Sequence, residues 1–119
     1  MSTDRELLEL AARAAGVRIG NWIEYADAEG FASDAKVAPW NPLTDDGDAL
    51  RLLTELRLCV DWQPGLEEVH VGHTIEDFPP AQVEYEEYDD FGNRQSLYRG
   101  AATRRAIVRA AAEIGKDMK

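Results

Sequence analysis

The fold is decided by residues 40–58, WNPLTDDGDALRLLTELRL. Pro42 marks a turn, because it fixes its own φ and disfavours helix at Asn41. The Thr44 hydroxyl can accept a hydrogen bond from an otherwise unsatisfied helix N–H, so we expect Thr44 to be the N-cap. Apolar residues then recur along one face at spacings of three and four: Ala49, Leu52, Leu53 and Leu56. The stretch therefore predicts a helix over 46–56.

This helix is expected to begin with acidic residues and to lead directly into a strand. Asp45, Asp46 and Asp48 fall in its first turn, where the helix dipole is positive. They lack the glycine and bidentate glutamate order of an EF-hand loop, so we interpret them as capping residues rather than calcium ligands. After residue 56 the apolar period changes to two, which predicts a strand over 58–62. A helix that joins a strand with almost no loop is expected to pack back on a sheet.

Two further helices are predicted, one at each end of the chain. The first covers 4–15: Thr3 and Glu6 form a capping-box pattern before it, and Gly16 is expected to end it. The other covers 101–116, with an apolar face of Ile107, Ala110, Ala111 and Ile114. Both patterns are typical of amphipathic helices that pack on a core.

The rest of the chain predicts short strands, and 27–36 is expected to be a loop or a frayed strand. The expected strands are 17–19, 22–26, 35–38, 67–72, 81–88 and 96–98, with Gly20–Asn21 as a hairpin turn. Strands that are neighbours in sequence would pair as hairpins. The fold class is therefore α+β: one domain, residues 1–119, with three helices and a mostly antiparallel sheet.

Three stretches together resemble a known family. They are the central string 40–58, the N-terminal ELLELAARAAG at 6–16 and the C-terminal AATRRAIVRAAAEIGKDMK at 101–119. They are similar to small bacteriophage proteins that carry the phage ABA sandwich domain. The resemblance implies a three-layer α/β/α sandwich in a phage or prophage protein. It supplies no catalytic residues, and it does not cover the middle of the chain.

Composition favours a cytoplasmic protein. The 119 residues include one cysteine, which excludes an internal disulfide. No window resembles a membrane span, and the N-terminus lacks the basic and apolar regions of a secretory signal. The formal net charge of −10 disfavours direct binding to nucleic-acid phosphates and to anionic lipid. We therefore expect no direct nucleic-acid or membrane partner.

The charge is unevenly distributed along the chain. Residues 1–57 carry six basic and eleven acidic residues, a net −5. Residues 58–93 carry ten acidic residues and no Lys or Arg, a net −10. Residues 94–119 carry seven basic and two acidic residues, a net +5. The middle third is therefore purely acidic, and the last helix is basic.

The acidic middle third contains the candidate partner-binding run, residues 84–91. Its members are Glu84, Tyr85, Glu86, Glu87, Tyr88, Asp89, Asp90 and Phe91. One interpretation is a solvated edge strand whose charges block unwanted pairing. Another is a binding face, since aromatic residues anchor interfaces and carboxylates steer a basic partner toward them. A third is that Arg104, Arg105 and Arg109 neutralise part of the run, within the fold or across a dimer.

No catalytic or metal site is predicted. Cys59 is expected to be a small buried residue within its strand rather than a nucleophile. His70 and His73 lie three positions apart, which puts them on opposite faces of a regular strand, so we interpret both as surface residues. No phosphate-binding loop, nucleophile elbow or CxxC motif is present in the sequence.

We therefore predict a phage-encoded, non-enzymatic protein-binding factor that acts in the host bacterial cytoplasm without a cofactor. Its partner would be a host or defence protein with a basic face, which it would inhibit as an acidic mimic of nucleic acid, as an anti-CRISPR does. One alternative is a phage structural or assembly accessory protein that acts as a homo-oligomer, for example a homodimer. Another is a small metal-dependent hydrolase.

Overall fold

The computed structural model describes residues 3–25, 27–63, 68–72, 81–84 and 96–118. These residues form an α+β fold with three helices and five strands. In chain order the elements are α1 (Asp4–Ala15), β1 (Ile19–Tyr25), β2 (Ala28–Ser33), α2 (Asp46–Glu55), β3 (Cys59–Gln63), β4 (Glu68–Gly72), β5 (Ala81–Glu84) and α3 (Ser96–Lys116). The predicted fold class is confirmed at this level.

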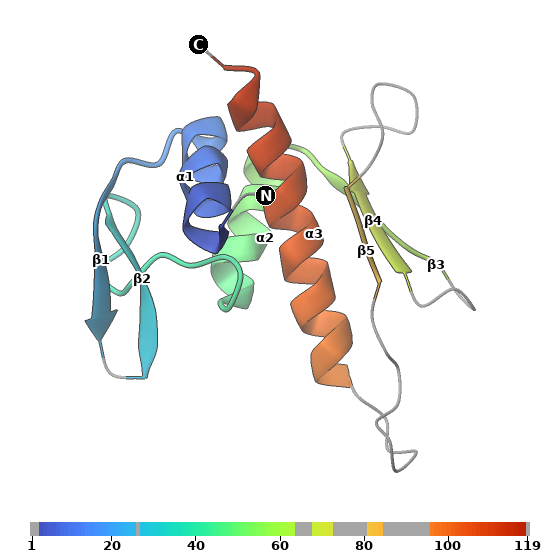
Figure 1. Cartoon of the computed structure of the whole chain (residues 1–119), viewed down its shortest axis with the longest axis horizontal. Helices are drawn as coiled ribbons and strands as arrows, with labels where there is room; N and C mark the ends of the chain where they lie inside the picture. The colour runs from blue at the N-terminus through green and yellow to red at the C-terminus, as the bar shows by residue number, and fades with distance from the viewer. Residues whose placement is uncertain (1–2, 26, 64–67, 73–80, 85–95, 119) are drawn as a thin grey trace.

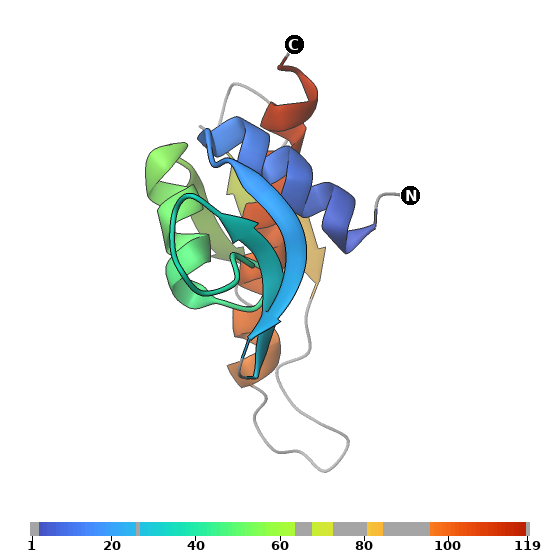
Figure 2. The same cartoon turned by 90° about the vertical axis from the view of Figure 1, so that its left-hand side faces the viewer.

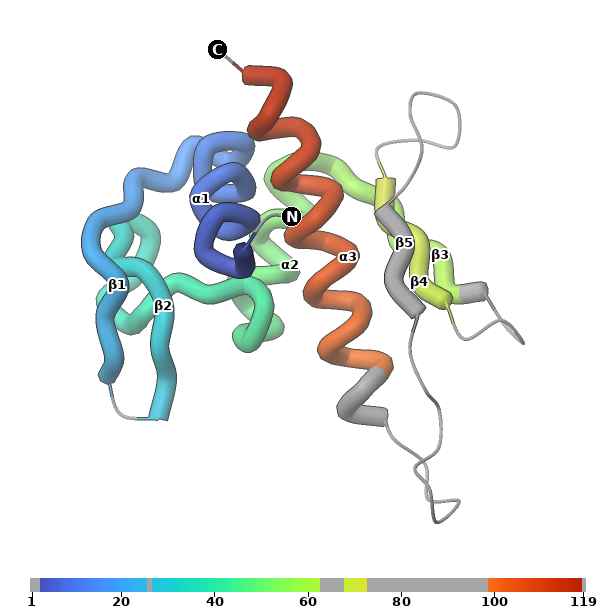
Figure 3. The backbone as a smooth tube through the Cα atoms, viewed as in Figure 1, coloured from blue at the N-terminus to red at the C-terminus, as the bar shows by residue number. Residues whose placement is uncertain are grey.

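The described helices lie between two antiparallel sheets (Figure 1). The β1–β2 hairpin covers α1 and α2 on one side, as Figure 2 shows from that direction. The sheet with strand order β3-β4-β5 lies on the far side of α3. The expected α/β/α layer order is not confirmed, because the helices here separate two sheets. Figure 3 traces the backbone from α2 to β3, passing from one side of α3 to the other.

The first helix follows its sequence signals. The Thr3 hydroxyl accepts a hydrogen bond from the Glu6 N–H at 3.1 Å, so Thr3 caps the N-terminus. Gly16 ends α1 with a φ of 73° in the left-handed region, where glycine has no Cβ penalty. The Val17 N–H then donates to the Ala12 carbonyl at 2.9 Å. Both predicted ends of this helix are confirmed.

The predicted N-cap of α2 is wrong by one residue. Asp45 is the cap, and its carboxylate accepts from the Asp48 N–H at 2.8 Å. The Thr44 hydroxyl instead donates to the Asn41 carbonyl at 3.4 Å within the turn that Pro42 introduces. Since both residue types cap helices well, the turn decides between them. At the other end, Arg57 has a φ of 55°, a left-handed conformation that lets β3 follow at once.

The β1–β2 hairpin corrects two expectations and decides a third. The predicted turn at Gly20–Asn21 lies inside β1, where the register is irregular between Ile19 and Trp22. Of the two alternatives expected over 27–36, a loop or a frayed strand, the structure has the strand, β2. No strand forms over 35–38; instead Trp40 makes an isolated bridge to Phe31, with backbone hydrogen bonds of 2.8 and 3.0 Å.

The second sheet packs one face on α3. Val69 and Val71 of β4 are fully buried, and they pair in register with Trp62 and Val60 of β3. This alternation confirms the half-buried strands predicted over 58–62 and 67–72. The described part of the strand predicted over 81–88 is β5, Ala81–Glu84; residues 85–88 lie outside the described residues.

The last helix begins earlier than predicted. Residues 96–98, expected to form a strand, are the first turn of α3. Gly100 lies within the helix rather than before it. Small residues line the side of α3 that meets the core: Ala102, Ala106, Ala110 and Ala111 are all buried. None of the described helices is both long and apolar enough to cross a membrane.

Candidate functional site

The predicted partner-binding run lies largely outside the described residues. Of residues 84–91, only Glu84 is described, as the last residue of β5. Its Cα partner across the ladder is Glu68 of β4. The positions of Tyr85, Glu86, Glu87, Tyr88, Asp89, Asp90 and Phe91 fall outside the described ranges. The structure therefore describes one end of the proposed face.

Two of the three arginines considered for neutralising that run, Arg104 and Arg105, pair with other carboxylates. Arg104 lies 2.7 Å from the Asp46 carboxylate, and Arg105 lies 3.0 Å from that of Asp4. The second pair ties α3 to α1, while the first ties α3 to the start of α2. Both arginines therefore bind acidic residues outside 84–91.

Cys59 is exposed, so the expectation of a buried thiol is wrong. The alternation of β3 explains this, because Val60 and Trp62 occupy the face toward α3 and leave Cys59 on the opposite face. On that same outer face, His70 Nε2 lies 3.2 Å from the Glu68 carboxylate. His73 lies outside the described residues, and in the described part of the chain no group of three His, Cys, Asp or Glu could hold a metal ion.

The three acidic residues at the start of α2 have separate structural roles. Asp45 caps the helix, Asp46 pairs with Arg104, and Asp48 is fully buried. The Asp48 carboxylate accepts from Lys36 Nζ at 3.1 Å, from the Asn41 N–H at 2.9 Å and from Arg51 at 3.2 Å. A buried carboxylate needs such partners, because its desolvation is costly. The prediction that the three aspartates cap the helix is confirmed for Asp45. Asp48 instead connects the preceding loop to the helix.

A second acidic surface lies where the β1–β2 hairpin meets the start of α2. A hollow of about 580 Å³ is lined by Glu24, Asp27, Ala28, Glu29, Thr44 and Asp45. Glu24 and Glu29 are directly paired across the hairpin ladder, and both are exposed. Like charges at directly paired positions repel. The sequence gives no signal of this surface, because it depends on the register in which β1 pairs with β2.

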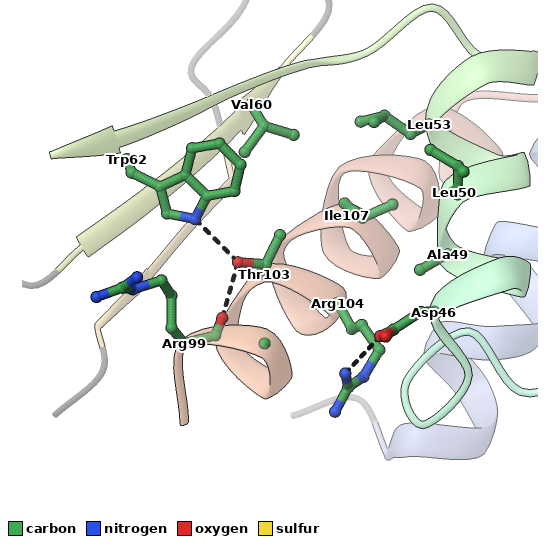
Figure 4. Close-up of a pocket in the computed structure, with 11 residues that line it drawn as sticks. Asp46, Ala49, Leu50, Leu53, Val60, Trp62, Arg99, Thr103, Arg104 and Ile107 are labelled. Atoms are coloured by element: carbon green, nitrogen blue, oxygen red, sulfur yellow. Dashed lines mark hydrogen bonds and ion pairs between the residues drawn. The ribbon is translucent and has the colours of Figure 1, made fainter. Parts of the chain in front are cut away.

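An apolar groove of about 490 Å³ lies between α2, α3 and β3 (Figure 4). Its floor is α3, which contributes Thr103 and Ile107. One wall is β3 with Val60 and Trp62, and the other is α2. The α2 residues that line it are Asp46, Ala49, Leu50 and Leu53, and α3 adds Arg99, Gly100 and Arg104. We call this site the α2–α3–β3 groove.

Hydrogen bonds fix the polar groups of the groove. The Trp62 indole N–H donates to the Thr103 hydroxyl at 3.1 Å, and that hydroxyl donates to the Arg99 carbonyl at 2.8 Å. Arg104 donates through Nε to the Leu43 carbonyl at 2.8 Å and through Nη1 to Asp46 at 2.7 Å. The charged residues lie along one end of the groove, away from Leu53 and Val60 (Figure 4).

Large apolar side chains remain exposed at this groove. Leu50 is 57% exposed and Trp62 is 48% exposed. The sequence predicted the strand that carries Trp62 and the helix that carries Leu50, but it gave no signal that the two residues flank one groove.

Comparisons of the chain with protein-family models, with curated proteins and with solved structures gave no match.

Proposed function

We propose that the chain is a phage-encoded, non-enzymatic protein-binding factor that acts on a basic host or defence protein in the bacterial cytoplasm. It would occupy a nucleic-acid groove of its partner, with carboxylates in place of phosphates, as an inhibitor of the anti-CRISPR kind. Membership of the phage ABA sandwich family, and the sandwich which that family implies, are part of this proposal. The proposed contact face is the 84–91 run.

One observation carries the proposal: residues 58–93 hold ten acidic residues and no Lys or Arg. Such segregation creates a strongly negative field that steers a cationic partner and raises its association rate. A chain with the same net charge spread evenly along its length would keep its solubility without this segregation. The segregation therefore supports recognition of a basic surface.

Strand register adds support from the described residues. In the β1–β2 hairpin, Glu24 is paired directly with Glu29, and both are exposed. Acidic residues at directly opposite positions destabilise a ladder. A basic partner would relieve this repulsion on binding, which gives the association a favourable electrostatic contribution. This pairing favours a binding role for the acidic surface of the hairpin.

The test is affinity capture with matched charge reversals. One variant carries Glu84→Lys, Glu86→Lys and Asp89→Lys. The control carries Glu9→Lys, Glu55→Lys and Asp117→Lys, three exposed acidic residues of the helices and the C-terminus. Both variants change the net charge equally, so only the position of the charge differs.

We expect the wild type and the control to capture the same nucleic-acid-handling protein from host lysate, and the 84/86/89 variant to lose it. The captured protein should elute as salt rises, because exposed charges are screened over about 8–10 Å at moderate ionic strength. Capture that persists in the 84/86/89 variant would refute the proposed face. Light scattering at low and high salt tests the homo-oligomer, and elemental analysis tests the metal-dependent hydrolase.

A further inference from the structure

We propose that the α2–α3–β3 groove binds a small amphiphilic carboxylate, with its hydrocarbon body in the groove and its carboxylate on Arg104. None of its lining residues belongs to the acidic 84–91 run, and it would recognise the opposite charge. The proposal does not depend on the protein-binding function proposed above. Three features of the groove lead to it.

The first feature is the size and the apolar lining of the groove. Ala49, Leu50, Leu53, Val60, Trp62 and Ile107 enclose it on three sides. Its volume of about 490 Å³ lies in the usual range of ligand sites, and at one water volume per atom it holds on the order of 15 non-hydrogen atoms. Burying the exposed parts of Leu50 and Trp62 under a hydrocarbon is favourable.

The second feature is that the Thr103 hydroxyl on the floor of the groove already uses its hydrogen-bonding capacity within the protein. The single hydroxyl proton of Thr103 goes to the Arg99 carbonyl, and its oxygen already accepts from the Trp62 indole. The same bonds hold the Trp62 ring in place before any ligand arrives, which lowers the entropy cost of binding. A polar ligand body would gain few hydrogen bonds here, whereas a hydrocarbon loses none.

The third feature is the charge at the end of the groove. The Arg104 guanidinium is anchored by the Leu43 carbonyl and has only one carboxylate partner among the described residues, Asp46. Two of its five N–H groups make these bonds, which leaves donors for a second carboxylate. The Asp46 side chain is 88% exposed, so water screens its pair with Arg104 and a ligand can compete with it.

The surroundings of Arg104 add to this preference. Asp46 is the first residue of α2, and Arg99 lies in the N-terminal part of α3, so the positive ends of two helix dipoles lie near the charged end. An amphiphile with an acidic head matches the remaining donors of Arg104 and these dipoles, and a cationic one does not.

The first experiment uses fluorescence of anilinonaphthalene sulfonate, an apolar probe with one acidic group, bound to the full chain. Decanoate, decanol and decyltrimethylammonium compete for it below the concentrations at which they form micelles. We expect one probe site per chain, with displacement strongest by decanoate and weakest by the cation. Equal displacement by all three would overturn the role of Arg104, and absence of probe binding would overturn the site.

Matched variants locate the probe. Leu50→Glu should weaken decanoate binding by about tenfold or more, because it places a carboxylate beside the hydrocarbon. Val37→Glu changes another exposed apolar residue outside the groove and should leave binding unchanged. Arg104→Gln should weaken decanoate by about tenfold, and Arg105→Gln, which loses only the pair with Asp4, should not. Equal effects within either pair would overturn the site.

A gain of affinity provides the sharpest test. Asp46→Asn removes the carboxylate that competes for Arg104, so decanoate should bind about threefold more tightly while decanol is unaffected. A misfolded variant cannot produce this selective gain. Decanoate affinity equal to or below that of the wild type would overturn the assignment of the carboxylate to Arg104.

Discussion

The helix layer has two sides, and they differ in how closely they are packed. On the side of α1 and the hairpin, a Cβ built on Gly115 of α3 would meet the backbone of Leu10, and Asp48 is fully buried among polar partners. On the side of β3, the same helices leave a groove of about 490 Å³. The first side has no space for a methyl group added at Gly115, whereas the second has space for a ligand. The difference suggests that stability resides on one side and binding on the other.

The helix α2 contributes to both sides because of its geometry. Two residues that are two positions apart on an α-helix point in nearly opposite directions, because each residue turns the helix by about 100°. Asp48 and Leu52 therefore face the packed interior, while Asp46 and Leu50 line the groove. Asp46 is therefore a matched control for Asp48, and Leu50 is a matched control for Leu52.

The largest effect is expected at the aspartates. Asp48→Ala should lower the free energy of unfolding by about 3–5 kcal/mol, because it leaves Lys36 and the buried Asn41 N–H without their acceptor. Asp46→Ala removes a screened, exposed pair and should change it by less than about 1 kcal/mol. Urea unfolding followed by tryptophan fluorescence measures both. Similar losses would mean that the two sides are equally important for stability.

The leucines should show the next largest difference. Leu52 is 2% exposed, so Leu52→Ala should cost about 2–5 kcal/mol through lost burial and a cavity. Leu50 is largely exposed, and Leu50→Ala should cost less than about 1 kcal/mol. The midpoints of thermal unfolding give the order directly. A larger loss for Leu50→Ala would show that the groove wall is part of the core.

The sequence predicts the elements whose signals are local. The helix α1 has a capping box, an apolar stripe and a terminal glycine within a few residues, and both its ends are found where predicted. Thr44 fails as a cap because its hydroxyl bonds within the preceding turn, a choice that residue type does not reveal. The strand β2 is small and polar in sequence, and its place depends on the distant bridge between Phe31 and Trp40. Such pairing is not encoded in local periodicity.

The groove could not be predicted for the same reason. Trp62 and Thr103 are 41 positions apart in sequence, and their hydrogen bond joins two sides of the site. The expectation that Cys59 is buried rests on residue type, because free cysteine is among the residues most often buried. The alternation with Val60 and Trp62 already placed it on the other face, which only the structure shows to be exposed. The acidic run at 84–91 was found from charge alone, and its role stays a prediction.

The two glycines of α3 give a prediction in which the sign of the effect differs between the two sides. A helix with glycine at an interior position is less stable than the same helix with alanine there, by roughly 0.5–1 kcal/mol. Gly100→Ala places its Cβ 3.4 Å from Arg104 Nη1, at the limit of ordinary van der Waals contact, so the variant should be more stable by about that amount. Gly115→Ala drives its Cβ into the Leu10 carbonyl, where α1 and α3 meet. It should lose roughly 1–3 kcal/mol despite the better helix propensity.

Urea unfolding of the two alanine variants beside the wild type decides the point, because propensity alone predicts a gain for both. Opposite signs would show that backbone contact with α1 outweighs propensity at residue 115 and that the groove side has space to spare. A gain at both positions would mean that α1 can move away from α3 at little cost. The close packing assigned to that side would then be wrong, and with it the view that stability and binding are divided between the two sides of the helix layer.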